Sequence, residues 1–301
     1  MELGMIGLGR MGANMAQRLL RAGHGVIGFD PKAEARTELE GHGGRSAQSL
    51  AALIAAMPTP RAVWMMVPAG SITDGTVETL AGLLAPGDVL IDGGNSNYKD
   101  TLRRAAQLAQ HSVAYVDAGT SGGVWGLAEG YSLMIGGDVA VVESLRPIFE
   151  TLAPAPDRGW GRVGPVGSGH FTKMVHNGIE YGLMQAYAEG FSILEHKKDF
   201  ALDLHQVAEI WRTGSVVRSW LLDLTADALA KNPAMDGIAP WVADSGEGRW
   251  TLQEAIDLDV PAPVIALSLM ARLRSRDTDS FADKLLAAMR NEFGGHAIKK
   301  E

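Results

Sequence analysis

Cysteine is absent from the 301 residues of this chain. Disulfide bridges, cysteine-ligated zinc and a cysteine nucleophile are therefore excluded. Positive charge is also scarce, because 27 Lys and Arg face 35 Asp and Glu and leave a formal net charge of −8. A protein that binds nucleic acid or an anionic membrane over a broad surface needs a positive field, so the charge balance argues against both partners.

Long apolar runs are lacking as well. The apolar stretches at 49–57 and 260–271 are short or interrupted by proline, and both fall well below the ~18 residues that a membrane-spanning helix requires. The N-terminus shows no basic segment followed by an apolar run and a cleavage site, so we expect a cytoplasmic protein.

Two different patterns occupy the two halves of the chain. The first half alternates apolar strands with amphipathic helices, which predicts a parallel sheet covered on both faces. The segment 153–169 is rich in proline and glycine and predicts a linker. Beyond it the periodicity is helical. We therefore predict an α/β N-terminal domain with a doubly wound sheet over residues 1–165, followed by an all-α domain over 166–301.

A glycine-rich loop follows the first predicted strand and opens the first predicted helix. All six of its residues are candidate cofactor contacts: Gly7, Leu8, Gly9, Arg10, Met11 and Gly12. The G-x-G-x-x-G spacing predicts a tight turn, a close approach of the backbone to a pyrophosphate, and a helix N-terminus that faces the phosphate charge. This context favours a Rossmann-type dinucleotide site over a plain surface turn.

An acidic residue lies where such a site needs one. Asp30 ends the next strand, 18 residues after Gly12, and its carboxylate suits the hydroxyls of the adenosine ribose. The same charge repels a 2′-phosphate, so the sequence favours NAD over NADP. Lys32 and Arg36 lie just beyond and could tolerate that phosphate, which keeps NADP open.

Three later strands end in loops of small residues, at 67–70, 93–96 and 120–123. Ligands of open α/β sheets bind beyond the carboxyl ends of the strands. Each loop alone is as well explained as a capped strand–helix connection, but three in series favour a site. The candidate contacts are Val67, Pro68, Ala69 and Asn95 for the cofactor, and Asn95, Ser121, Gly122 and Gly123 for the substrate.

A polar stripe runs along the long helix predicted at 170–197. At about 100° per residue, five side chains fall within about 140° of one face: Lys173, His176, Asn177, Glu180 and Tyr181. Such a stripe is either a solvated face or a catalytic one. Gly178 and Gly182 each cost ~1 kcal/mol inside a helix, which indicates close packing or a ligand. With apolar residues on most other sides, the pattern favours a largely buried, catalytic helix.

Four motifs resemble the decarboxylating 6-phosphogluconate dehydrogenase family: Gly7–Gly12, Ile91–Ser96, Ser121–Gly123 and Lys173–Gly182. The last motif separates that family from the 3-hydroxyisobutyrate-type dehydrogenases, which share only its Lys-x-x-x-Asn core. Further similarity lies at Trp211-Arg212, Val217–Ser219 and Arg290–His296. The chain is similar to the short, NAD-dependent form, which has a single copy of the helical half, and Asp30 departs from the Asn-Arg-Thr pattern of NADP-dependent members.

The resemblance implies that 6-phosphogluconate is oxidised and decarboxylated to ribulose 5-phosphate by NAD without a metal, as in the pentose phosphate pathway and in gluconate utilisation. It implies Lys173 as the base and Glu180 as the acid, with Asn177 and His176 holding the reacting groups. The substrate carboxylate would lie at Ser121, Gly122 and Gly123. The implied phosphate ligands are Tyr181, Arg218, Arg290 and His296, the last two reaching a neighbouring active site in a homodimer or homotetramer.

Departures from the family pattern leave questions open. The family's lysine before its Gly-x-Gly-Lys-Trp-Thr segment is missing from Asp244–Thr251, where Arg249 replaces the second lysine. Two alternatives remain: a 3-hydroxyacid dehydrogenase or imine reductase of the same fold, and a non-catalytic NAD-binding sensor. Glu180 and the Arg290/His296 pair argue against the first alternative, and the intact Lys173/Glu180 pair against the second.

Overall fold

The computed structural model describes residues 1–299. The chain divides into two compact units, Met1–His176 and Asn177–Glu301, which we call unit 1 and unit 2. The division falls inside one long helix, α9 (Ser168–His196). The boundary expected between residues 165 and 166 lies just before this helix and remains a proposal.

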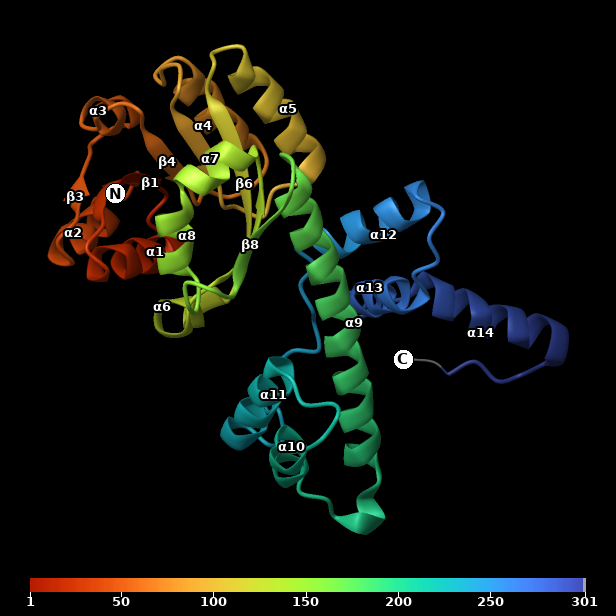
Figure 1. Ribbon diagram of the computed structural model, residues 1–301. Helices are drawn as coiled ribbons and strands as arrows, with labels where there is room; N and C mark the ends of the chain where they lie inside the picture. The colour runs from red at the N-terminus through yellow and green to blue at the C-terminus, as the bar shows by residue number, and fades with distance from the viewer. Residues whose placement is uncertain (300–301) are drawn as a thin grey trace. The chain divides into compact units, whose positions relative to one another are not determined.

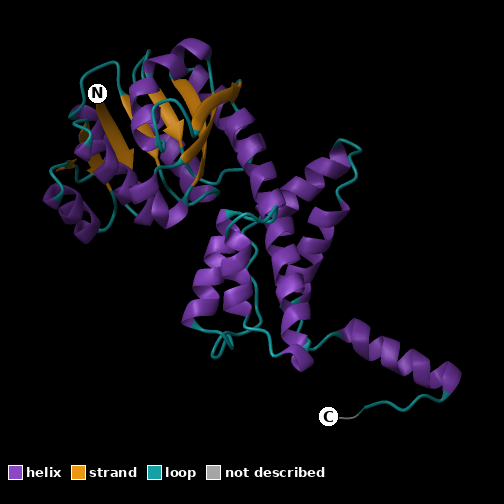
Figure 2. Ribbon diagram, turned by 60° about the horizontal axis from the view of Figure 1, so that its bottom comes forward, coloured by secondary structure: helices purple, strands orange, loops and turns teal. Residues whose placement is uncertain are grey.

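Unit 1 contains an eight-stranded sheet in the order β3-β2-β1-β4-β5-β6-β7-β8, drawn in orange in Figure 2. All neighbouring strands pair in parallel except β6 and β7. The order reverses at β1, and open α/β sheets bind their ligands at such a switch point. The strands are β1 (Glu2–Ile6), β2 (Gly25–Phe29), β3 (Arg45–Ser46), β4 (Ala62–Met65), β5 (Val89–Asp92), β6 (Ala114–Ser121), β7 (Ser132–Gly136) and β8 (Trp160–Gly164).

Helices cover both faces of this sheet (Figure 1). Side chains alternate between the two faces along each strand, so an apolar strand presents apolar side chains to both helical layers. Leu3 and Met5 of β1 join one core, and Ile6 joins the other. The first core is closed by α1 (Arg10–Arg21), α2 (Ala33–Gly41), α7 (Val139–Ser144) and α8 (Arg146–Leu152), and the second by α3 (Leu50–Ala55), α4 (Ser71–Ala81) and α5 (Tyr98–Ala109). The short helix α6 (Gly126–Glu129) packs against α1.

One local prediction differs from the structure. The segment expected to be a linker contains β8, which extends the sheet beside β7. Its glycines and half-exposed side chains give no apolar run, so its composition indicates a loop. The segment after β7 forms two helices, α7 and α8, which meet at Leu145. Pro147 stands in the first turn of α8, where its missing N–H costs nothing.

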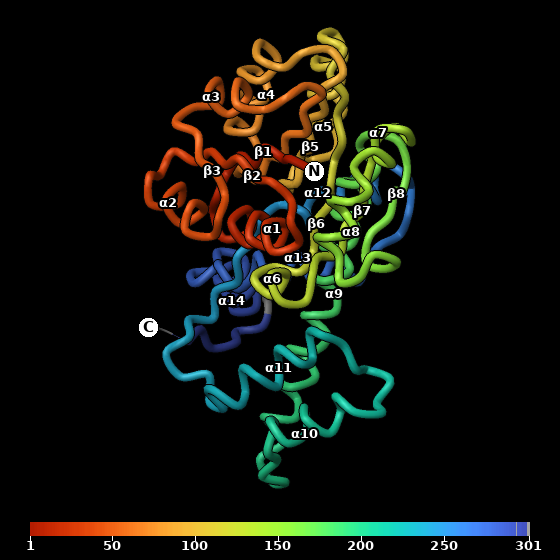
Figure 3. Tube along the Cα trace, turned by 60° about the vertical axis from the view of Figure 1, so that its left-hand side comes forward, coloured from red at the N-terminus to blue at the C-terminus, as the bar shows by residue number. Residues whose placement is uncertain are grey.

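Unit 2 is helical, as predicted for the second half of the chain. After its part of α9 follow α10 (Leu204–Arg212), α11 (Trp220–Lys231), α12 (Glu247–Asp257), α13 (Pro263–Arg274) and α14 (Phe281–Gly294). Helices α10 and α11 lie side by side (Figure 3) and share a small core: Phe191, Ala208, Leu222, Ala226 and Leu229. Within residues 1–299, no helix has both the length and the apolar character needed to cross a membrane.

Candidate active site

The glycine loop has the geometry of a nucleotide-binding turn. Gly7 has a φ of +89°, and a Cβ there would lie 2.5 Å from the carbonyl oxygen of Met66. A Cβ on Gly12 would lie 1.9 Å from the carbonyl oxygen of Gly7. Packing therefore requires both glycines. Gly9 has no atom within 4 Å of its Cβ position, so this part of the loop leaves room for a ligand to approach the backbone.

Asp30 is bound to the glycine loop itself. Its Oδ2 accepts a hydrogen bond from the Leu8 N–H at 2.9 Å, and its Oδ1 accepts one from the Lys32 N–H at 2.9 Å. A carboxylate offers about four acceptor positions, so two remain for a ribose. Arg36 donates to the Asp30 carbonyl oxygen at 2.6 Å and to Gln48 Oε1 at 2.9 Å. The Arg36 guanidinium is thus committed to this loop, whereas the Lys32 side chain is exposed.

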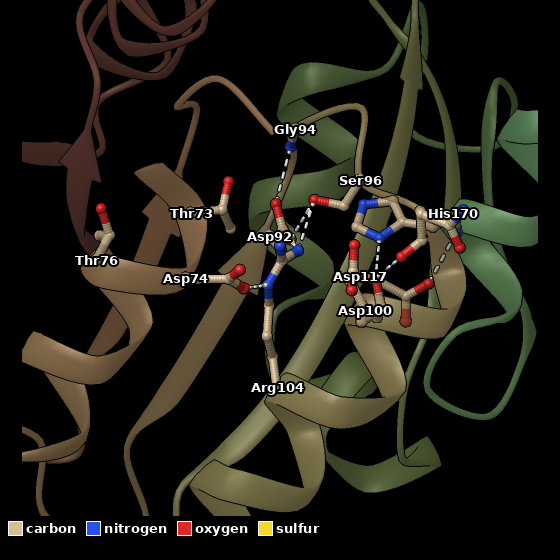
Figure 4. A network of polar contacts seen from close by, with 12 residues as sticks. Thr73, Asp74, Thr76, Asp92, Gly94, Ser96, Asp100, Arg104, Asp117 and His170 are labelled. Atoms are coloured by element: carbon tan, nitrogen blue, oxygen red, sulfur yellow. Dashed lines mark hydrogen bonds and ion pairs between the residues drawn. The ribbon is translucent and has the colours of Figure 1, made fainter. Parts of the chain in front are cut away.

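Asn95 is exposed, and the residues on both sides of it are hydrogen-bonded to the buried carboxylate of Asp92. Asp92 accepts hydrogen bonds from the Gly94 N–H at 3.0 Å and from Ser96 Oγ at 2.9 Å, as Figure 4 shows. Arg104 from α5 donates to Ser96 Oγ at 3.0 Å and lies 3.6 Å from Asp92. These contacts fix the backbone on both sides of Asn95.

A buried tyrosine completes the Asp92 group. Tyr115 donates to Asp92 Oδ2 at 2.9 Å. Burial, and then the neighbouring Asp92 charge, raise the pKa of the Tyr115 hydroxyl well above its usual value. Tyr115 therefore stays a donor at neutral pH, and the Asp92 carboxylate keeps a full set of partners in its buried position.

Lys173 lies in unit 1, buried against strand β6. A Cβ on Gly119 would come within 2.6 Å of both Lys173 Cβ and the Gly169 carbonyl oxygen, so the start of α9 packs directly on this strand. Two residues beyond Gly119, β6 ends at Ser121. Gly122 and Gly123 follow with φ values of +130° and +52°. Lys173 Nζ lies 3.4 Å from His176 Nδ1, one turn further along α9. Unit 1 therefore brings Lys173 and His176 together.

Helix α9 begins on a buried carboxylate that the sequence analysis missed. Asp117 accepts hydrogen bonds from the Gly167 N–H at 2.7 Å and from the His170 N–H at 2.8 Å, and Figure 4 shows its position beside His170. Capping of this kind is worth about 0.5–2 kcal/mol. The sequence signal for this role is an aspartate inside an apolar strand, because a buried carboxylate needs hydrogen-bond partners.

In unit 2, the next residues of α9 are packed against α12 and α13. A Cβ on Gly178 would lie 2.6 Å from Thr251 Cγ2, so close helix packing accounts for this mid-helix glycine. Asn177 and Tyr181 are both buried. The Arg272 guanidinium lies 3.4 Å from the centre of the Tyr181 ring in a cation–π contact. The sequence analysis missed Arg272, which looks like any arginine in the last turn of a helix.

Other predicted residues lie apart from this cluster. Arg218 is exposed in the loop between α10 and α11, where the neighbouring Val217 carbonyl accepts a hydrogen bond from Tyr187. Tyr187 is six residues beyond Tyr181, or about 9 Å along α9. The structure therefore does not place Arg218 beside Tyr181.

The C-terminal pair forms a local group of its own. Arg290 and His296 are exposed at the end of α14. Asn291 Nδ2 donates to the His296 carbonyl oxygen at 2.9 Å, which folds the tail back on the helix end. The expectation of a largely buried catalytic helix is wrong for unit 2 of the single chain, because Ile179 is 52% exposed and Leu183 is 46% exposed. Within residues 1–299, no group of three or more acidic or histidine side chains suits a metal ion.

Two family models match successive parts of the chain. One is the NAD binding domain of 6-phosphogluconate dehydrogenase, over residues 2–162, and the other is the C-terminal domain of 6-phosphogluconate dehydrogenase, over 169–292. The NAD(+)-dependent, decarboxylating 6-phosphogluconate dehydrogenase of Haloferax volcanii is 43% identical, over 100% of this chain and 99% of that protein.

Longer proteins are similar over part of their length. The NADP(+)-dependent, decarboxylating 6-phosphogluconate dehydrogenase of Bacillus subtilis is 37% identical over 91% of this chain, and the match covers 61% of that protein. The solved structure of Plasmodium falciparum 6-phosphogluconate dehydrogenase aligns with a TM-score of 0.84 at 28% identity, over 100% of this chain and 66% of that one. Similarity extends to relatives of either cofactor, so it does not settle the choice between NAD and NADP.

Proposed function

The chain belongs to the 6-phosphogluconate dehydrogenase family, and from this premise we propose that it oxidises and decarboxylates 6-phosphogluconate with NAD. The products are ribulose 5-phosphate, CO₂ and NADH. The observation that carries the proposal is the buried Lys173, packed on β6 at Gly119, two residues before that strand of the sheet ends at Ser121. A buried lysine amine at that place suits proton removal from a substrate hydroxyl during hydride transfer.

The proposed reaction has three steps. Lys173 takes the proton of the C3 hydroxyl while the C3 hydride passes to the nicotinamide. The protonated lysine then polarises the new C3 carbonyl as the C1 carboxylate leaves as CO₂. Glu180 protonates the enediol at the carbon that carried the carboxylate, which is C2 of the substrate and C1 of ribulose 5-phosphate. Seven residues of one helix separate Lys173 and Glu180, or about 10 Å along its axis, which suits a short sugar acid. His176 and Asn177, between them, hold the reacting hydroxyl and carboxylate.

Cations are assigned to the phosphate end of the substrate. Arg249 forms an ion pair with the buried Asp244 at 2.5 Å, so we do not assign it the role of the missing family lysine. Arg272 is the better candidate, because it lies on the Tyr181 ring and an arginine fork matches phosphate geometry. Arg290 and His296 remain proposed phosphate ligands. The role of Arg218 as a phosphate ligand is supported only by the family resemblance.

Cofactor preference is assigned to the Asp30 loop. Two open acceptor positions on Asp30 suit the ribose hydroxyls of NAD, and its charge opposes a 2′-phosphate. Arg36 is occupied by Asp30 and Gln48, which removes one of the two cations that would favour NADP. We therefore propose that NAD is preferred, with Gly7–Gly12, Val67, Pro68, Ala69 and Asn95 around the cofactor.

A homo-oligomer is proposed from the helices of unit 2. Leu267 on α13 is 69% exposed, and Phe281 on α14 is 76% exposed. Val264 and Leu286 on the same helices are also exposed, so each helix carries an apolar stripe. Contiguous stripes of this kind mark interfaces, and closed homo-oligomers are the common solution. We propose a dimer or tetramer in which Arg290 and His296 reach a neighbouring active site. A cytoplasmic location stays a prediction.

One assay separates the candidate activities. Purified protein is mixed with NAD and 6-phosphogluconate, and NADH formation is followed by its absorbance together with CO₂ release. Equal rates of the two are expected. Oxidation of 3-hydroxyisobutyrate with NAD, or reduction of a cyclic imine with NADH, would instead favour the alternative enzymes. NAD binding without turnover of any of them would favour a sensor.

A further inference from the structure

Helices α5 and α9 of unit 1 are joined by a buried polar contact that the proposed mechanism does not use. Thr101 of α5 and His170 of α9 are both almost fully buried. Thr101 Oγ1 lies 2.7 Å from His170 Nδ1. Beside them, the rings of Tyr98 and Phe171 meet edge to face at 5.2 Å. The first turns of the two helices are therefore locked together at this point.

The direction of the hydrogen bonds follows from what surrounds them. Thr101 Oγ1 lies 3.3 Å from the Asn97 carbonyl oxygen, which accepts only. His170 Nε2 is buried and has no hydrogen-bond partner among the described residues. A proton on Nε2 would leave a buried N–H unsatisfied, which is rarer and costlier than a bare acceptor. His170 therefore donates from Nδ1 to Thr101, and Thr101 donates to Asn97.

The two ends of this chain of hydrogen bonds lie next to two proposed site residues. His170 is three residues before Lys173 on α9. Asn97 caps α5, where its side chain accepts the Lys99 N–H at 2.9 Å, and it lies two residues after Asn95. The His170–Thr101–Asn97 chain therefore ties the Asn95 loop to the start of α9, across the gap between two helices that are distant in sequence.

We propose that the His170–Thr101–Asn97 hydrogen-bond chain sets the position of the Lys173 amine relative to the Asn95 loop. Thr101 and His170 are thus positioning residues, and neither touches the reacting atoms. The proposal rests on the roles proposed above for Lys173 and Asn95. Because the chain crosses from one helix to the other, its loss lets Lys173 shift while the fold remains. A misplacement of about 1 Å can cost 10²-fold in rate.

The test compares Thr101→Val, which removes the hydroxyl at nearly constant volume, with Thr101→Ser, which keeps it. We expect Thr101→Val to lower kcat by about tenfold or more, with the KM for NAD unchanged. The deuterium isotope effect on kcat, measured with C3-deuterated substrate, should rise because hydride transfer becomes slower. Thr101→Ser should stay within about twofold of wild type. His170→Asn, whose amide keeps a donor near the Nδ1 position, should retain more activity than His170→Leu.

A matched control is Thr225→Val on α11, where the threonine hydroxyl donates to the Leu221 carbonyl at 2.8 Å; its kcat should equal that of wild type. Thermal unfolding of each variant shows whether the fold is kept. A wild-type kcat in Thr101→Val, equal losses in Thr101→Val and Thr101→Ser, or a loss matching the unfolded fraction would each overturn the proposal. Absence of turnover in the wild-type protein would instead overturn the proposed function.

Discussion

The two units differ in how much of their apolar surface they bury. Unit 1 encloses two large cores on the two faces of its sheet. The described core of unit 2 is one cluster of five buried residues between α9, α10 and α11. Helices α13 and α14 meanwhile expose large side chains such as Val264, Leu267 and Phe281. Unit 1 has the core of a self-sufficient domain, whereas unit 2 exposes apolar surface of the kind that marks interaction sites.

The polar side chains of the two units differ in the same sense. In unit 1, Asp92 and Asp117 are buried and accept hydrogen bonds that fix the Asn95 loop and the start of α9. In unit 2, Arg218, Arg290 and His296 are exposed. The residues proposed for hydride transfer and for the first proton transfer are thus held in unit 1, whereas the proposed acid Glu180 belongs to unit 2. The proposed contacts to the substrate phosphate depend more on what covers unit 2.

The largest effect is expected from Lys173→Met in unit 1. Removal of the proposed base should lower kcat by about 10²–10⁴-fold, because no other amine is assigned to the C3 hydroxyl. NAD affinity, measured by titration of the bound cofactor, should stay close to wild type. Lys231→Met, at an exposed position near the end of α11, is the control and should keep full activity. A Lys173→Met enzyme with more than a few per cent of wild-type turnover would remove this lysine from the mechanism.

The next effect tests whether unit 2 needs a second copy. Leu286→Glu places a charge on the exposed apolar face of α14, and we expect it to dissociate the oligomer and to lower activity by about 10²-fold. Lys284→Glu changes charge on the same helix, where a surface ion pair is worth little, and should leave both unchanged. Sedimentation velocity and the enzyme assay measure the two outcomes. A wild-type chain that is fully active as a monomer would contradict the prediction.

Subunit mixing sharpens the same prediction. Lys173→Met and Arg290→Ala subunits are each expected to be inactive alone. If the tail completes a neighbouring site, a mixed oligomer has some sites with an intact Lys173 from one subunit and an intact Arg290 from the other. Activity should then return on subunit exchange. Lack of recovery despite demonstrated exchange would show that each chain completes its own site.

Local signals in the sequence are sufficient for most of unit 1. The strand–turn–helix context of Gly7–Gly12 and the apolar run of β1 depend on neighbours in the chain, so they predict the sheet and its ligand edge. Strand β8 is missed because its glycines and half-exposed side chains give no such run. The spacing of Lys173, His176 and Asn177 also predicts a shared helix face, since helix geometry is local.

The supporting residues could not be found in this way, because their partners are distant in sequence. Asp117 caps a helix that begins at Ser168, and Arg272 lies on the ring of Tyr181. Neither pairing has a fixed spacing. The exposed face of α9 is a different case. Ile179 and Leu183 form an apolar stripe, and such a stripe predicts burial. In the single chain both are exposed, so the prediction would hold only if a second subunit covered them. This dependence on a second subunit is what distinguishes unit 2 from unit 1.

A smaller effect is expected at the cofactor loop of unit 1. Asp30→Asn should reduce the preference for NAD over NADP by about tenfold, since a charge-assisted hydrogen bond to a hydroxyl contributes about 1.5–3 kcal/mol and part of it remains with the amide. The ratio of kcat/KM for the two cofactors is the measurement. Lys32→Ala is the companion variant and should raise the preference for NAD slightly. A wild-type enzyme that prefers NADP would contradict the role proposed for Asp30 in the choice of NAD.

The smallest expected effect is on the pH dependence of stability. It is tested at one buried carboxylate in each unit, Asp88 in unit 1 and Asp244 in unit 2. Burial alone would raise the pKa of Asp88 in unit 1, but the N–H groups of Ala85 and Arg61 and the Arg61 guanidinium outweigh it and hold the pKa below its ordinary 3.8. For Asp244 in unit 2, burial would likewise raise the pKa, and it is outweighed by Arg249 and by the Gly246 N–H. A depressed pKa in the folded state contributes stability that is present above 3.8 and is lost as pH falls through the folded pKa.

Asp88→Asn should therefore lower the free energy of unfolding by about 1–3 kcal/mol at pH 7, measured by urea unfolding, and the difference from wild type should shrink as pH falls below 3.8. Asp244→Asn should show the same trend with a smaller loss, because Asp244 accepts hydrogen bonds from two groups and Asp88 from three. The Asp88→Asn loss should not depend on protein concentration, since the core of unit 1 needs no partner. A loss that grew on dilution would mean that unit 1 also depends on a second subunit, and the contrast between the two units would fail.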